Sequence, residues 1–293
     1  SMVRSMTGYG RGEYMANECH FVVEIKSVNH RYNDISIKLP RFMNGMEDAI
    51  RKRIMKEIAR GKTDVYITFE TFSVDNVIVK VNEPLAMAYI EKLHELEQKF
   101  DVSSQNTLDL VARFADVITV EKTEGQEDIL WKILLPALEQ AISKFVEMRE
   151  KEGTALVNDI LNKREQIQKM LETIKQRCPF VVNEYKEKLQ NRIKELLSTV
   201  EIDEQRIAME TALFADRSCI DEEVTRLESH IVQLKDILQK GGQIGRKLDF
   251  LVQEMNREVN TIASKANDIE ITGVTIEMKS EIEKIREQIQ NIE

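Results

Sequence analysis

The sequence is poor in residues that interrupt or cross-link a chain. Its 293 residues include 11 glycines, 4 prolines, 1 tryptophan and 3 cysteines. The cysteines, Cys19, Cys178 and Cys219, are far apart and odd in number, which excludes a zinc-finger pattern and a disulfide framework. Such low cysteine usage fits a reducing compartment, and we expect a cytoplasmic protein.

Long apolar stretches and familiar catalytic patterns are also absent. No segment reaches the roughly 18 apolar residues that a transmembrane helix needs. The chain opens in charged, patterned sequence, so we expect neither a signal peptide nor a membrane span. The histidines fit neither the zinc-binding HExxH pattern nor a His-Asp nuclease signature, so no known catalytic motif identifies the chemistry.

The balance of charge excludes a basic surface over the whole chain. The sequence contains 42 Lys+Arg and 51 Asp+Glu, for a net charge of −9. Residues 1–80 contain 13 basic and 10 acidic residues, or +3, which leaves 29 basic and 41 acidic residues, or −12, for the remainder. Because phosphate groups need only local positive charge, any nucleic-acid contact is expected in the N-terminal part. The acidic remainder suits metal binding, limits nonspecific nucleic-acid binding, or serves solubility alone.

Composition and periodicity predict an α+β protein. With 32% charged residues and few glycines or prolines, the chain suits long exposed helices. Alternating apolar residues predict strands at 21–26, 35–39, 64–72 and 77–81. Helical spacing predicts helices at 46–60 and 84–100, so the first hundred residues should form a mostly antiparallel sheet with packed helices.

From about residue 109 onward the patterns are helical. Helices are expected at 131–150 and 153–176, with Pro136 as a site for a kink. The Cys178-Pro179 pair disfavours a continuous helix at that point. The segment after Asp268 is expected to be extended and to lead into a last helix.

An apolar seam in that last helix bears on assembly. It is too short for a stable isolated coiled coil, so the helix should pack on the body of the protein or on a second subunit, and we expect a homo-oligomer. We divide the chain into an N-terminal α+β domain at 2–155, a central helical segment at 156–204 and a C-terminal helical domain at 205–293. The seam consists of Met278, Ile282, Ile285, Ile289 and Ile292.

Residues 245–268 combine a continuous apolar stripe with a charged flank. Glu254 and Glu258 are four residues apart on that flank, where like charges on a helix repel. Neither has a cation four residues away outside the pair. The pattern therefore predicts compensation by a cation from another helix, by a metal ion or by water. The stripe consists of Leu248, Leu251, Val252, Met255, Val259, Ile262 and Ala266.

The preceding helix at 221–240 has charged residues on a matching flank. Asp221 is its expected N-cap, and Gly241 and Gly242 should end it, giving an antiparallel helical hairpin. Counted outward from the turn, His230 is level with Glu254, and Arg226 is level with Glu258. An imidazole and carboxylates in that arrangement bind a divalent metal, move protons, or form an ordinary ion network.

A second candidate site lies in IKSVNHRYND, where one strand gives way to the next. Arg31 can hold a phosphate, His30 can transfer a proton, and Tyr32 can stack on a base. A capped turn with a surface cation is the simpler interpretation. The basic residues Arg11 and Lys62 would extend the same surface.

Several long segments resemble the YicC/YloC family of bacterial proteins over nearly the whole chain. They are SMTGYGRGE, VEIKSVNHRYNDISIKLP, RGKTDVYI, REKEG, EEVTRLESHI and RKLDFLVQEMNREVNTIASKAND. The resemblance implies a metal-dependent endoribonuclease that cleaves RNA phosphodiester bonds in bacterial RNA turnover. It also implies a homo-oligomer, a hexameric ring. The alternatives are a non-catalytic RNA-binding adaptor that delivers RNA to a partner nuclease, such as an exonuclease, and a helical scaffold without an RNA role.

Metal-assisted RNA cleavage needs a hard cation such as Mg²⁺ or Mn²⁺ held by carboxylates. We therefore take Glu254, Glu258 and His230 as candidate catalytic residues, and the His30–Arg31 turn as the competing position of the catalytic centre. The candidate metal ligands are Glu254, Glu258, Glu223 and His230. The candidate RNA contacts are His30, Arg31, Arg11, Lys62, Arg246, Lys247, Arg257 and Lys265.

Overall fold

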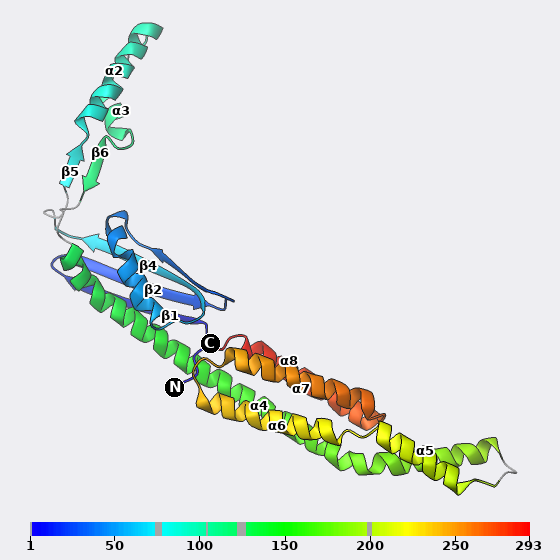
Figure 1. Ribbon diagram of the computed structural model, residues 1–293. Coiled ribbons are helices and arrows are strands. Elements are labelled where there is room, and N and C mark those ends of the chain that lie inside the picture. Colours follow the sequence, from blue (N-terminus) through cyan, green and yellow to red (C-terminus); the bar gives the residue numbers. More distant parts are fainter. Residues whose placement is uncertain (1, 74–77, 104, 122–126, 198–200) are drawn as a thin grey trace. The chain divides into compact units, whose positions relative to one another are not determined.

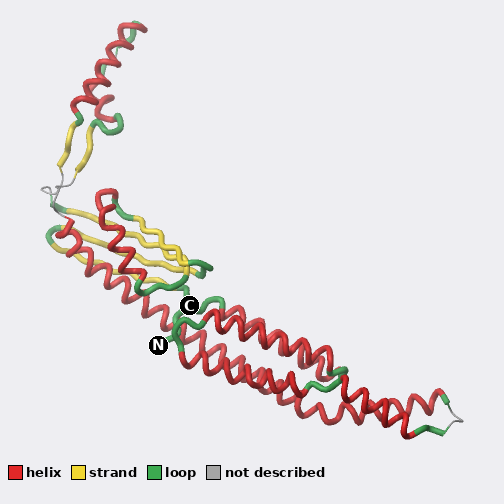
Figure 2. Tube along the Cα trace, in the orientation of Figure 1, coloured by secondary structure: helices red, strands yellow, loops and turns green. Residues whose placement is uncertain are grey.

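The computed structural model describes residues 2–73, 78–103, 105–121, 127–197 and 201–293 (Figures 1 and 2). These residues form two compact units. The helical unit consists of Ser1–Gly8, Ser27–Asn33 and Val146–Glu293, and the sheet unit consists of Tyr9–Lys26 and Asp34–Phe145. The protein is α+β, as the sequence predicts. The three-part division of the chain stays a prediction.

A four-stranded sheet has the order β1-β2-β4-β3. The alternation seen in the sequence is the alternation of burial, since Phe21, Val23 and Ile25 are fully buried on one face of β2, and Val65 is fully buried on β4. The strands are β1 (Gly8–Ala16), β2 (Cys19–Val28), β3 (Asn33–Lys38) and β4 (Gly61–Thr71).

Helix α4 (Glu127–Leu196) lies directly against β1 in the sheet unit. A Cβ atom added to Gly10 would fall 2.1 Å from the carbonyl oxygen of Ala141, and one added to Gly12 would fall 2.1 Å from that of Ala137. The glycines of the SMTGYGRGE motif thus allow strand and helix backbones to touch. A 3₁₀ helix, η1 (Arg41–Met46), leads into α1 (Glu47–Met55), which is shorter than the helix expected at 46–60.

The sheet unit also contains a small two-stranded sheet. Strand β5 (Ile78–Val81) pairs antiparallel with β6 (Ile118–Glu121), a strand that the helical reading of the chain after residue 109 missed. Residue 77, part of the expected strand at 77–81, lies outside the described residues. Helix α2 (Glu83–Phe100) begins as predicted, with Asn82 as its N-cap, and α3 is Thr107–Arg113.

The expected interruption at Cys178-Pro179 is wrong. Helix α4 is continuous through 70 residues, Pro136 and Pro179 included. Tertiary packing outweighs the local cost of proline, because Ile174 and Val181 on either side of Pro179 belong to the core of the helical unit. Arg177 also spans Pro179 by a bidentate hydrogen-bonded ion pair with Glu184.

Four more helices complete the helical unit. The seam of the last helix packs on the body of the same chain, since Met278, Ile282 and Ile285 are fully buried. The segment expected to be extended after Asp268 is helical, because the Asp268 carboxylate accepts the amide of Ile271 at 3.1 Å and starts α8. The helices are α5 (Glu204–Arg217), α6 (Asp221–Lys240), α7 (Gly245–Lys265) and α8 (Ile269–Ile289).

The REKEG motif ties distant segments of the helical unit together. Arg149, fully buried, donates to the carbonyl oxygen of Ser5 at 2.6 Å and to Glu293 Oε2 at 2.8 Å. A Cβ added to Gly153 would meet the carbonyl oxygen of Val3 at 2.1 Å. This motif therefore serves packing. None of the helices in the described part of the chain is long and apolar enough to cross a membrane.

Candidate functional site

The hairpin of α6 and α7 is antiparallel, as the sequence predicts. Gly241 and Gly242 adopt positive φ angles of 62° and 81° after α6, and α7 begins at Gly245. Arg226 near the start of α6 contacts Glu258 near the end of α7, with Nε donating to Oε1 at 2.9 Å. The N-cap of α6 is Ile220, which makes no side-chain capping bond, and Asp221 is the first residue of the helix.

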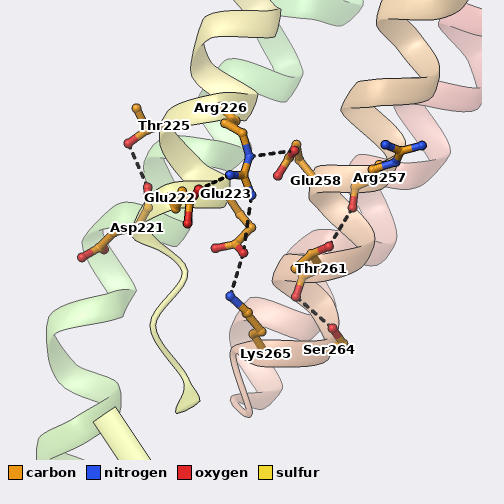
Figure 3. Close-up of polar contacts among 10 residues, drawn as sticks. All are labelled: Asp221, Glu222, Glu223, Thr225, Arg226, Arg257, Glu258, Thr261, Ser264 and Lys265. Carbon is orange, nitrogen blue, oxygen red and sulfur yellow. Dashed lines mark hydrogen bonds and ion pairs between the residues drawn. The ribbon is translucent and has the colours of Figure 1, made fainter. Parts of the chain in front are cut away.

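Five charged side chains form a connected group across this hairpin, which we name the ion cluster: Glu222, Glu223, Arg226, Glu258 and Lys265 (Figure 3). Lys265 Nζ donates to Glu223 Oε1 at 2.7 Å. Arg226 Nη1 donates to Glu222, and its Nη2 lies 3.7 Å from Glu223 Oε1. Arg226 thus bridges three carboxylates and Lys265 binds one of them, so the cluster holds three carboxylates against two cations.

Burial divides the ion cluster into two layers. The side chains of Glu223 and Glu258 are 4% and 7% exposed, whereas those of Arg226 and Lys265 are 44% and 43% exposed. Glu223 and Glu258 therefore lie beneath the cations, which remain accessible to a ligand from solvent, whereas the third carboxylate, Glu222, is 77% exposed. This layering follows from the sequence, because the two glutamates border the apolar stripes while the long cationic side chains extend outward.

Hydrogen bonds favour the charged forms of Glu223, Arg226 and Lys265. Burial by itself raises the pKa of the Glu223 carboxyl, but the hydrogen bond from Lys265 and the nearby Arg226 outweigh it and hold the pKa below its usual range. The hydrogen bond to Glu258 raises the pKa of Arg226, and the one to Glu223 raises the pKa of Lys265. One oxygen, Glu223 Oε2, is buried without a hydrogen-bond partner in the described structure.

The compensation that the sequence requires for Glu254 and Glu258 comes from two arginines. Arg226 neutralises Glu258 from the neighbouring helix, which is one of the three possibilities that the sequence left open. Arg257, three residues from Glu254, lies 3.5 Å from it. The search for cations at four-residue spacing missed this pair, because residues three apart also face each other on a helix.

His230 does not join the group. Its Nδ1 atom is buried without a hydrogen-bond partner, and no hydrogen bond or ion pair connects it to Glu254 in the described part of the chain. His230 follows Glu223 by seven residues, which is two turns or about 10 Å along α6. The unpartnered atoms Glu223 Oε2 and His230 Nδ1 therefore belong to side chains two turns apart and do not form one site.

These residues do not fit a divalent metal ion within one chain. Among residues 2–73, 78–103, 105–121, 127–197 and 201–293, no three or more His, Cys, Asp or Glu side chains are grouped to hold one. Glu258 and Glu223 are already neutralised by Arg226 and Lys265, and Glu254 lies next to Arg257. We therefore derive no chemical step through a metal at this flank.

The N-terminal turn presents its candidate residues to solvent. His30, Arg31 and Tyr32 lie between β2 and β3 and are all exposed. The backbone amide of Tyr32 donates to His30 Nδ1 at 3.4 Å, and the Arg31 guanidinium lies 5.5 Å from the centroid of the Tyr32 ring. Local contacts thus arrange a cation beside an aromatic ring, an arrangement suited to a nucleotide.

The remaining candidate RNA contacts are exposed but scattered. Arg11, in the sheet unit, lies 3.3 Å from Glu13 and 3.8 Å from Glu24, so its charge is partly neutralised. Lys62 is exposed on β4. Arg246 and Lys247 are exposed in the first turn of α7, which contains no acidic residue.

Sequence reasoning missed the pairing of Glu223 with Lys265. Both were candidates, but for separate roles, as a metal ligand and a phosphate contact. Position 265 is one turn beyond the residue level with Glu223, and the long lysine side chain spans that turn. Asp268, in turn, belongs to another network, because it binds Arg177 at 3.0 Å.

Comparison with known proteins finds matches over nearly the whole chain. Residues 3–158 match the family model "Endoribonuclease YicC-like, N-terminal region", and residues 174–293 match "Endoribonuclease YicC-like, C-terminal". The chain belongs to the YicC family. The protein named "Probable endoribonuclease YicC" from Clostridioides difficile (strain 630) is 47% identical over 293 residues, which is 100% of both chains. A protein of the same name from Haemophilus influenzae (strain ATCC 51907 / DSM 11121 / KW20 / Rd) is 36% identical, again over 100% of both.

Proposed function

We propose that this YicC family member is a cytoplasmic endoribonuclease that cleaves RNA phosphodiester bonds in bacterial RNA turnover. Two full-length relatives named as probable endoribonucleases support the activity. The observation that carries a role for the α6–α7 hairpin is the layering of the ion cluster. Two half-exposed cations, Arg226 and Lys265, are held in place by two buried carboxylates.

Arg226 and Lys265 supply what a phosphodiester needs during cleavage. Negative charge grows on the phosphate oxygens in the transition state, and fixed cations beside them stabilise it without having to reorganise. A guanidinium presents several N–H donors in one plane, and the ammonium of Lys265 presents three. Glu223 and Glu258 are positioning residues in this proposal, since each orients a cation rather than touching RNA.

Dependence on Mg²⁺ or Mn²⁺ stays a prediction of the family resemblance. When bound, such an ion would activate water or neutralise charge on the phosphate. The proposed roles of Arg226 and Lys265 do not depend on it. Incubating the enzyme with labelled RNA in buffer with and without EDTA tests the metal requirement directly.

We also propose a homo-oligomer, and a hexamer as the resemblance implies. The seam at Met278–Ile292 no longer supports assembly, because it is buried within the chain. Exposed apolar side chains elsewhere in the sheet unit do: Met87, Phe100, Leu108 and Val120 are 58%, 61%, 84% and 66% exposed. Light scattering at micromolar concentration measures the subunit count, and a monomer would contradict this proposal.

The test of the proposed function compares the wild-type protein with Arg226→Ala on labelled RNA. Loss of a cation at the scissile phosphate should lower the cleavage rate on the order of 100-fold. Arg192→Ala is the matched control, because Arg192 is an exposed arginine of α4 that contacts Glu195 at 3.3 Å outside the ion cluster. Equal cleavage by wild type and Arg226→Ala would remove the cluster from the catalytic centre.

The same experiment separates the enzyme from the adaptor. A wild-type protein that binds RNA in a salt-dependent manner but leaves it intact, with or without divalent ions, would be a non-catalytic adaptor for a partner exonuclease. A protein that neither binds nor cleaves RNA would support the third interpretation, a helical scaffold without an RNA role. If cleavage persists in Arg226→Ala and is lost in His30→Ala, the N-terminal turn is the catalytic centre.

A further inference from the structure

The helical unit contains a second feature next to the ion cluster, an open hollow of about 460 Å³ that we name the Tyr185 hollow. Helices α4, α5 and α7 contribute to it. Its lining combines aromatic rings, cations, hydroxyl groups and one carboxylate, a mixture unlike a purely apolar packing defect. The lining residues are Tyr185, Glu210, Phe214, Arg217, Ser218, Ser264, Lys265 and Asn267.

A parallel pair of aromatic rings lines one part of the hollow. The rings of Tyr185 and Phe214 are stacked, with centroids 3.8 Å apart and planes inclined by only 3°. Phe214 is buried, whereas Tyr185 is partly exposed. Aromatic rings of this kind hold unpaired bases in proteins that bind single-stranded RNA, because every base has a flat π-face.

Two cations line the same hollow. Arg217 is exposed and makes no ion pair within the part of the chain that the structure describes. Lys265 donates to Glu223, but an ammonium has three N–H donors, so it retains donors for a second acceptor. An unpaired guanidinium beside a second cation is suited to a phosphate group.

The spacing of three residues on α5 gives the Tyr185 hollow an acidic end and a basic end. Glu210, Phe214 and Arg217 are separated by four and three residues, so they share one face of the helix. The carboxylate and the guanidinium are thereby about 10 Å apart along the axis, with the aromatic ring between them. Because Glu210 repels phosphate, an anionic group is favoured at the Arg217 end and hydrogen-bond donors are favoured at the Glu210 end.

We propose that the Tyr185 hollow binds one nucleotide unit of single-stranded RNA. The base lies against the Tyr185–Phe214 pair, its N–H groups donate to Glu210, and the phosphate contacts Arg217 and Lys265. This inference rests on the proposed function for its choice of RNA as ligand. Since Lys265 belongs both to the hollow and to the ion cluster, a nucleotide bound here places the neighbouring phosphodiester of the strand beside the cluster.

The test measures binding of a short fluorescein-labelled single-stranded RNA by fluorescence anisotropy over a range of salt concentrations. Arg217→Gln removes one phosphate contact, so the affinity should fall several-fold and the slope of log affinity against log salt should decrease by about 0.7. Tyr185→Leu keeps apolar packing on Phe214 but removes the ring, and should weaken binding roughly 5- to 150-fold with little change of slope. Arg192→Gln, outside the hollow, should match the wild type.

Two further measurements make the result decisive. Because Tyr185 contributes to packing, a melting curve must show that Tyr185→Leu is folded, and Arg217→Gln carries the test by itself if it is not. Wild-type affinity and salt slope in both folded variants would overturn the proposal. Cleavage of the same RNA separates this failure from failure of the proposed function. Binding that depends on Arg217 without any cleavage would support the nucleotide site and contradict the proposed nuclease activity. Undiminished binding and cleavage in the variants would contradict the nucleotide site and support the nuclease activity.

Discussion

Arg149 and Glu293, 144 residues apart in the chain, form a buried ion pair with 2.8 Å between Nη2 and Oε2. The Arg149 side chain has no exposed surface, and that of Glu293 is 9% exposed. The same guanidinium binds the Ser5 carbonyl through Nε. One arginine thereby joins Ser5, the first half of α4 and Glu293 within the helical unit.

Removing this arginine should be costly. Arg149→Met leaves the Glu293 carboxylate without its buried partner, and we expect the free energy of unfolding to fall by about 3–5 kcal/mol. Urea denaturation measures it. Arg113→Met is the control, because Arg113 pairs with Asp109 at the surface and such pairs contribute less than about 1 kcal/mol. Similar small losses in both variants would show that the buried pair is not a structural anchor.

Two glycines should respond to alanine in opposite ways. Gly10→Ala places a Cβ atom 2.1 Å from the Ala141 carbonyl oxygen, so β1 and α4 must separate, and we expect a loss of about 1–3 kcal/mol or more. Gly273, inside α8, has nothing within 4 Å of such an atom. Gly273→Ala should therefore stabilise the protein by about 0.5–1 kcal/mol, through helix propensity. Thermal melting of the two variants side by side gives both signs.

Glu258→Gln tests the positioning role in the ion cluster. The amide keeps the shape of the side chain but weakens the hold on Arg226, so kcat should fall by up to about 100-fold while KM and RNA binding change little. Stability should fall as well, since the mutual repulsion of Glu254 and Glu258 is already offset by Arg226 and Arg257. Single-turnover cleavage and RNA binding are the measurements. An equal loss of kcat in Glu254→Gln would extend the catalytic role along the flank.

Asp268 should make stability dependent on pH at the acid end. The hydrogen bond from Arg177 holds the pKa of this carboxyl below its usual range. A lowered pKa in the folded state means that the stabilisation is fully present above the ordinary aspartate pKa of about 3.9 and is lost as the pH falls through the folded value. Asp268→Asn keeps the helix cap but not the charge. Its stability deficit should therefore be largest near pH 7 and shrink below about pH 4; a deficit that is constant with pH would contradict this assignment.

The parts of the fold that follow from a repeated local pattern could be predicted from the sequence. The apolar stripe of α7 and the glycines before it predicted the helical hairpin. Counting residues outward from its turn correctly predicted that Arg226 lies beside Glu258. Local rules failed where packing decides. Pro179 lies inside α4 because Ile174 and Val181 must both reach the core, and no sequence pattern reports that demand.

The candidate site was only partly predictable for the same reason. The sequence identified the charged flanks, but the partner of each charge depends on side-chain reach across two helices. Lys265 binds Glu223 although it lies one helical turn beyond the position of α7 that faces Glu223. His230 makes no contact with Glu254, although the two residues are equally distant from the turn of the hairpin. The Tyr185 hollow was not foreseen, because its aromatic pair comes from α4 and α5, whose mutual position no local pattern specifies.

The layering of the ion cluster also bears on how RNA would leave the protein. At about 1 M ionic strength the Debye length shrinks to about 3 Å, so attraction between exposed cations and phosphates collapses. The bonds from Arg226 and Lys265 to the buried Glu258 and Glu223 are screened far less, because solvent ions cannot surround those carboxylates. High salt should therefore dissociate RNA from the hairpin without breaking the ion pairs that position Arg226 and Lys265. The protein should bind RNA again when the salt is removed.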